Sequence, residues 1–181
     1  MLNSDSFVTE LETALDYPSK LFSDPGLNGG GWHVHKSGGK LNTHLDYSMH
    51  PKLPLQRRLN LIVYLNSNWN SRWGGALGLW GNESSERPGK LVTSIEPKFN
   101  RAVLFDTALN SWHGLPEPIT CPNNENRKSI AIYYLSEPQT DASKRAKALF
   151  APTRDQETDP EILDLIKKRA SAGEAHTVYK K

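Results

Sequence analysis

The chain is poor in cysteine, with only Cys121 among its 181 residues. A single cysteine cannot form an intrachain disulfide, and a zinc site built on thiolates would have only one sulfur ligand. The sequence also has no uninterrupted apolar run of roughly 18 residues, the length of a membrane span, and residues 1–17 lack the apolar stretch of a signal peptide. We therefore expect a cytoplasmic protein with no membrane partner.

The chain also has no large excess of positive over negative charge. The formal net charge is +2, and residues 141–181 carry all of the excess. So small a surplus does not indicate a nucleic-acid-binding surface, and we expect no nucleic-acid partner. Hydrophobic residues make up 36% and charged residues 23% of the chain. That composition and length predict one folded domain of ordinary size.

The middle of the chain has the pattern of a β protein. Residues 6–16 carry apolar residues at helical spacing and predict a short amphipathic helix, with Ser4 or Asp5 as its N-cap. From residue 29 to 135, short apolar or alternating runs are separated by Gly, Pro, Asn and Ser, which favours an all-β sandwich or barrel. Two runs, Leu59–Leu65 and Ile130–Leu135, are almost wholly apolar and are predicted to be central strands.

Helical patterns return after Pro138. Ala142–Phe150 is a candidate short helix, and Asp159 and Pro160 form an N-cap and first position for a second helix. We expect residues 1–138 to form one domain and residues 139–181 to form a helical extension packed on it. The sequence leaves the oligomeric state open.

Three residues have the chemistry of a metal site. In an extended segment, positions i and i+2 point to the same side, so His44 and Asp46 can offer a nitrogen and an oxygen to one ion. His113 follows the run RAVLFDT and can supply a third ligand from a distant strand. Two histidines and one carboxylate form the facial triad of non-haem iron(II) oxygenases, although zinc hydrolases use similar ligands.

Arg127 and Ser129 have the chemistry of a carboxylate receptor. They stand two positions apart at the start of the last predicted strand, so their side chains share a face. A guanidinium gives a carboxylate a bidentate, charge-assisted pair of hydrogen bonds, and a hydroxyl adds one more. This arrangement suits the distal carboxylate of 2-oxoglutarate.

An ordered set of motifs between roughly residues 30 and 137 resembles the iron(II)- and 2-oxoglutarate-dependent oxygenases, in particular their prolyl 4-hydroxylase-like branch. The motifs are HLD at 44–46, NLIVYLNSNWNSRWGG followed by ALGLW, IEPKFNRAVLFD, SWHGLPEP, and RKS at 127–129 before IAIYYL. The resemblance implies a mainly β, double-stranded β-helix (jelly-roll) core with flanking helices. It also implies Fe(II), 2-oxoglutarate and O2, with ascorbate as a supporting reductant, and a Tyr64 hydroxyl that donates to the 2-oxoglutarate carboxylate.

The substrate is less well determined. The resemblance favours a prolyl residue of a peptide or protein, but related enzymes hydroxylate small molecules such as free amino acids or sugars. Trp112, next to a predicted ligand, and Arg58, beside the loop 47–56, are candidate substrate contacts. His33 and His35 are expected to form a polar face of the first strand rather than to bind metal. A non-catalytic jelly-roll binding module and a zinc hydrolase stay open as rival functions.

Overall fold

Two antiparallel sheets form the centre of the structure, which is a computed structural model describing residues 1–107, 110–140, 142–143 and 147–170. The first sheet has the order β1-β9-β4-β7, and β2 also pairs with β9. Its strands are β1 (Phe22–Ser23), β2 (Gly31–His35), β4 (Gln56–Tyr64), β7 (Ala102–Asp106) and β9 (Arg127–Ser136). The second sheet has the order β10-β3-β8-β5-β6. Its strands are β3 (His44–Leu45), β5 (Leu77–Ser84), β6 (Arg87–Ile95), β8 (His113–Gly114) and β10 (Leu149–Phe150).

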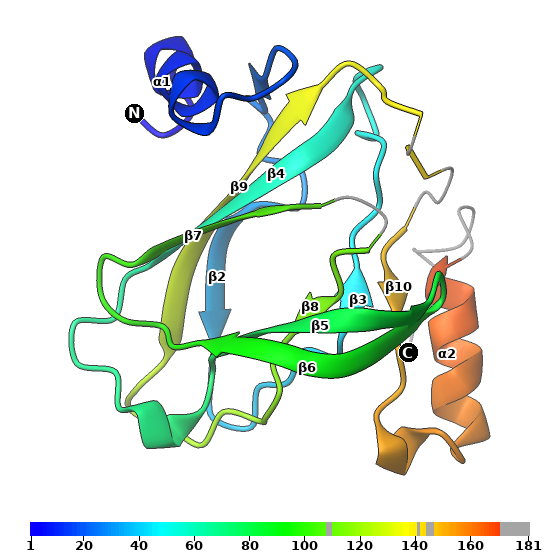
Figure 1. The fold of residues 1–181 in the computed structure, drawn as a ribbon. Coiled ribbons are helices and arrows are strands. Elements are labelled where there is room, and N and C mark those ends of the chain that lie inside the picture. The colour runs from blue at the N-terminus through cyan, green and yellow to red at the C-terminus, as the bar shows by residue number, and fades with distance from the viewer. Residues whose placement is uncertain (108–109, 141, 144–146, 171–181) are drawn as a thin grey trace.

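The central strands β4 and β9 pack against helix α1 (Asp5–Leu15) on one face and face the second sheet on the other. Alternate residues Leu59 and Leu61 on β4, with Ile132 and Tyr134 on β9, pack against Val8 and its neighbours in helix α1. The intervening residues face the second sheet, because side chains of a strand alternate between its two sides. Figure 1 shows α1 beside the ends of β4 and β9, away from the second sheet.

These elements confirm the predicted mainly β, jelly-roll fold with terminal helices, and also the two predicted central strands. The predicted N-terminal helix is confirmed as well, with the Ser4 hydroxyl accepting a hydrogen bond from the amide of Phe7. Two short 3-10 helices (Ser71–Trp73 and Arg154–Gln156) lie in the connections. Within the described part of the chain, neither α-helix has the length and apolar character needed to cross a membrane.

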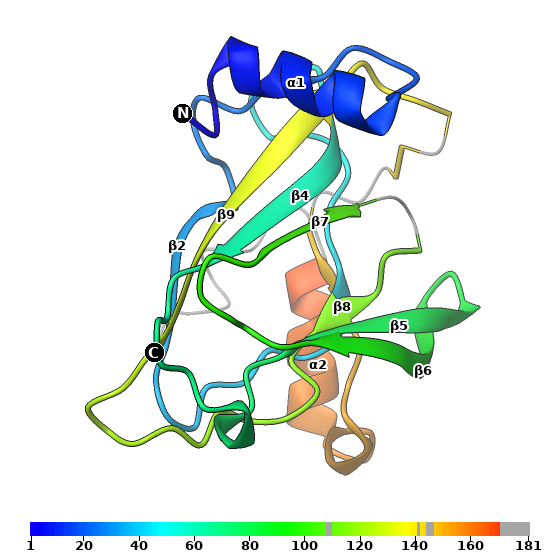
Figure 2. The ribbon, with the colours of Figure 1, turned by 60° about the vertical axis from the view of Figure 1, so that its left-hand side comes forward.

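The prediction of a helix over Ala142–Phe150 is wrong for the residues that the structure describes. Leu149 and Phe150 form strand β10 and pair with Leu45 and His44 of β3. Residues 144–146 of the predicted helix are not among the residues that the structure describes. The second predicted helix is confirmed as α2 (Pro160–Ala170), whose first amides bond to the Asp159 carboxylate. Figure 2 shows α2 next to the second sheet, far from α1.

We propose that residues 139–181 belong to the same domain as residues 1–138. Deletion of residues 141–181 removes β10, the Ala151 side chain that packs on Leu45 and Trp112, and helix α2. Loss of that apolar packing is expected to cost at least about 2 kcal/mol of unfolding free energy, or about 4–8 °C in melting temperature. Thermal unfolding followed by circular dichroism measures this. An unchanged melting temperature would contradict the proposal.

Candidate active site

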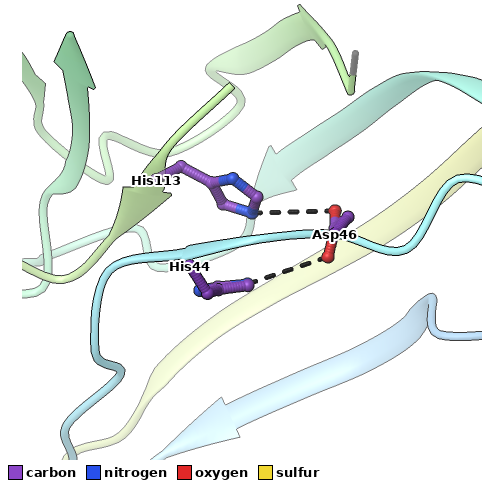
Figure 3. Close-up of side chains that lie close together, drawn as sticks. All are labelled: His44, Asp46 and His113. Carbon is purple, nitrogen blue, oxygen red and sulfur yellow. Dashed lines mark ion pairs between the residues drawn. The ribbon is translucent and has the colours of Figure 1, made fainter. Parts of the chain in front are cut away.

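His44, Asp46 and His113 come together between the two sheets. His44 and His113 are cross-strand partners on β3 and β8, and their ring centres are 4.3 Å apart. Nε2 of each histidine lies 3.7 Å from an oxygen of Asp46, His44 from Oδ1 and His113 from Oδ2 (Figure 3). One potential ligand atom from each residue lies within 4.8 Å of the other two, and all three side chains are buried. One metal ion can therefore contact all three side chains.

The backbone fixes which nitrogen each histidine presents. Nδ1 of His44 lies 2.9 Å from the carbonyl oxygen of Asn42, and Nδ1 of His113 lies 2.8 Å from that of Ser111. A carbonyl oxygen can only accept, so each Nδ1 carries the proton and each Nε2 keeps its lone pair for a metal. A second hydrogen bond of this kind also holds the ring of a ligating histidine in place.

The electrostatics favour a neutral histidine beside an ionised carboxylate. Burial, and then the neighbouring His113, lower the pKa of His44 to about 4. Burial by itself would raise the pKa of Asp46, but His113 and His44, followed by the Tyr133 hydrogen bond and Arg57, lower it overall. These are the protonation states that a metal ion requires of its ligands.

A pocket of about 430 Å³ opens beside the triad. Its walls come from both sheets and contain both apolar and polar side chains. The apolar lining includes Leu41, Ile62, Leu77 and Leu115, and the polar lining includes the three triad residues, Asn60, Arg127, Ser129 and Tyr133. This mixture is typical of small-ligand sites, in which a few polar groups orient a molecule within an apolar cavity.

Arg127 is a buried cation in the wall of this pocket. Its Nε donates to the carbonyl oxygen of Gly75 at 2.6 Å, and its Nη1 lies 3.5 Å from the hydroxyl of Ser129. Among the residues that the structure describes, no carboxylate lies within ion-pair distance of it. Because a buried charge is costly without a counter-charge, an anionic ligand in the pocket would stabilise it.

Tyr64 packs beside this arginine. The guanidinium carbon lies 5.0 Å from the centre of the Tyr64 ring, and Tyr64 pairs with Ser129 across β4 and β9. Burial raises the pKa of the Tyr64 hydroxyl, so that it stays protonated and able to donate. The structure thus brings Arg127, Ser129 and Tyr64 together; Arg127 and Ser129 line the pocket, whereas Tyr64 is fully buried beside them and is not part of the lining.

The two candidate substrate contacts lie elsewhere. Trp112 is 1% exposed and packs on Leu45 and Ala151, and it is not among the residues that line the pocket. Arg58 donates to Asp106 at 3.1 Å and to the Tyr17 hydroxyl at 3.1 Å, also outside the pocket lining. Neither residue is therefore part of the pocket lining, and their role as substrate contacts stays a prediction.

His33 and His35 line the pocket, as do Trp32 and Val34 of the same strand, and the two histidines are less exposed than these neighbours. They pair with Ser129 and Arg127, respectively, across β2 and β9. Burial, and then the charge of Arg127, lower the pKa of both histidines, that of His35 to about 4. The metal cluster found among the described residues includes neither of them.

Sequence comparison shows similarity to known oxygenases. The sequence model of the 2OG-Fe(II) oxygenase superfamily matches residues 30–142. Prolyl 3-hydroxylase OGFOD1 of Xenopus laevis is 34% identical over 64 residues, which are 35% of this chain and 12% of that protein. OGFOD1 of Mus musculus is 30% identical over 78 residues, 43% of this chain and 14% of that protein. The chain thus matches only a small part of each curated relative.

Among solved structures, a prolyl 4-hydroxylase of Phytophthora capsici superposes with a TM-score of 0.50 at 21% sequence identity, covering 94% of this chain and 52% of that one. This likeness supports the fold. A Trichoplax adhaerens prolyl hydroxylase solved with a hypoxia inducible factor peptide gives a TM-score of 0.43 at 28% identity, covering 59% of this chain and 43% of the other.

Proposed function

The chain belongs to the 2OG-Fe(II) oxygenase superfamily, and from this premise we propose that it hydroxylates a prolyl residue of a peptide or protein, using Fe(II), 2-oxoglutarate and O2. One observation carries the proposal. A cluster of two histidines and a carboxylate shares a pocket with a buried arginine that has no carboxylate partner among the described residues. A zinc hydrolase has no use for such an arginine. A binding module that had lost catalysis would be expected to lack one of these groups.

The residues present fit the metal and the cosubstrate. His44, Asp46 and His113 would hold iron, since two imidazoles and one carboxylate leave coordination positions open for other ligands. Arg127, with Ser129 and Tyr64, would bind the distal carboxylate of 2-oxoglutarate by charge-assisted hydrogen bonds. When bound, iron and 2-oxoglutarate would supply the electrons that reduce O2: 2-oxoglutarate would be oxidised to succinate and CO2 with one oxygen atom, and the other oxygen atom would be inserted into a C–H bond.

The protein itself orients the metal-binding side chains and keeps water away from part of the pocket. The backbone carbonyls of Asn42 and Ser111 orient the two imidazoles, and Leu77 and Leu115 keep part of the pocket wall apolar. An apolar wall that excludes water limits side reactions at a reactive metal centre. The choice of a prolyl substrate draws on the two curated relatives, which are named as prolyl 3-hydroxylases.

The proposal is tested with a peptide library in which each member carries a single proline. Incubation with Fe(II), 2-oxoglutarate and air is expected to give succinate together with a peptide heavier by one oxygen atom. The same peptide with alanine in place of proline is the control and should stay unmodified. Mass spectrometry and succinate assay read out both products. Turnover of free amino acids but of no peptide, or product formed without O2, would contradict the proposal.

A further inference from the structure

Tyr133 lines the pocket beside the proposed metal ligands. It sits on β9, and its hydroxyl donates to Oδ2 of Asp46 at 2.7 Å, the same oxygen that faces His113. Both side chains are buried. A neutral phenol donating to a carboxylate in a buried site forms a short, charge-assisted hydrogen bond, of the kind that restricts rotation of the acceptor.

Arg57 holds the Tyr133 ring from the other side. Its guanidinium carbon lies 4.0 Å from the centre of the Tyr133 ring and 3.8 Å from that of Tyr47, so the cation is enclosed between two aromatic faces. Arg57 also donates to the hydroxyl of Tyr47 at 2.7 Å and to the backbone carbonyl of Asn28. These contacts form one stack, Tyr47–Arg57–Tyr133, which we name the aromatic stack.

The charge of Arg57 has a consequence for the hydrogen bond. Arg57 is 1% exposed, and among the described residues no carboxylate lies within ion-pair distance of it. A cation over an aromatic face is attracted by its π-electrons. That pull draws electron density away from the phenol and makes its O–H a better donor to Asp46. The stack is therefore suited to orient the carboxylate as well as to fill space.

We infer that Tyr133, held by Arg57 and Tyr47, is a positioning residue that fixes the orientation of the Asp46 carboxylate and so sets the affinity of the metal site. The inference rests on the metal site of the proposed function. A carboxylate free to turn must lose that freedom when it binds a metal, whereas a pre-oriented one has lost it already. Removal of such an outer hydrogen bond typically weakens metal binding by about 10- to 100-fold.

The matched test compares Tyr133→Phe with Tyr134→Phe. Each change removes one buried hydroxyl from neighbouring positions of β9, but the Tyr134 hydroxyl donates to the carbonyl of Leu2 and faces α1. Anaerobic titration of each full-length variant with Co(II), followed by its visible absorption, gives both a dissociation constant and a ligand-field spectrum. We expect Tyr133→Phe to weaken Co(II) binding by about 10-fold or more and to change the spectrum. Tyr134→Phe should match the wild type in both.

Arg57→Lys tests the stack itself. Lysine keeps the charge but loses the planar group that fits between two rings, so we expect weaker Co(II) binding. In the double variant with Tyr133→Phe, the two effects should be less than additive, because both act through one hydroxyl. Wild-type affinity in Tyr133→Phe, or equal loss in Tyr133→Phe and Tyr134→Phe, would overturn the inference while leaving the proposed function intact. If the wild type itself bound no Co(II), the proposed function would fail as well.

Discussion

Replacement of His113 by alanine is expected to lower the affinity for Fe(II) or Co(II) by more than the roughly 10- to 100-fold that loss of an outer-shell partner costs, and to abolish turnover. His113 is the one proposed ligand on β8, so its loss leaves only His44 and Asp46 of β3 and its continuation. The remaining pair cannot enclose an ion from three sides. Anaerobic metal titration measures the affinity, with circular dichroism to check the fold.

His50→Ala is the control for this variant. His50 is also a buried histidine near a carboxylate, with its Nε2 3.4 Å from Asp24, and its Nδ1 accepts from the amides of Lys52 and Leu53. It lies outside the triad, so its loss should lower stability but leave the metal affinity of the folded protein unchanged. If His113→Ala kept wild-type metal affinity, or His50→Ala lost it equally, the assignment of the ligands would be wrong.

Replacement of Arg127 by alanine is expected to weaken 2-oxoglutarate binding by roughly 10- to 100-fold, the value of hydrogen bonds to a charged group, while metal affinity stays unchanged. The guanidinium is buried beside Ser129 and Tyr64. Among the described residues, no other arginine or lysine lines the pocket, so none can take its place in binding the carboxylate. Calorimetric titration of the Mn(II)-loaded protein with 2-oxoglutarate under nitrogen measures the dissociation constant.

Two further arginine variants separate charge from geometry. Arg127→Lys retains the charge but not the two-pronged donor, and it should bind 2-oxoglutarate with intermediate affinity. Arg101→Ala is the control, because Arg101 also bonds to a backbone carbonyl, that of Glu96, but does not line the pocket. Unchanged affinity in Arg127→Ala, or the same loss in Arg101→Ala, would show that the carboxylate is held elsewhere.

The sequence allows the strands and the His44–Asp46 pair to be predicted because both follow from local patterns. Alternation and turn residues mark the strands of the two sheets, and spacing of two in an extended segment places His44 and Asp46 on one side. The third ligand depends on the pairing of β3 with β8, which puts His113 opposite His44. Local spacing does not determine strand register across the fold, so the sequence could offer His113 only as a candidate ligand from a distant strand, which the resemblance to a family then supported.

Other features depend on tertiary contacts. Leu149 and Phe150 read as part of a helical segment, but their pairing with β3 overrides the local preference. Trp112 stands next to His113, yet neighbours in an extended segment point to opposite sides, and the tryptophan is buried in the core. The contact of Tyr133 with Asp46 joins residues 87 positions apart, and no sequence spacing indicates it.

The central claim, that this pocket binds iron and 2-oxoglutarate together, is tested most directly by anaerobic titration of the Fe(II)-loaded wild-type protein with 2-oxoglutarate. A weak visible absorption band should appear and saturate as 2-oxoglutarate binds the iron, and the same titration of Arg127→Ala should need far more 2-oxoglutarate to reach it. Iron bound by the wild type with no such band at any concentration of 2-oxoglutarate would contradict the account.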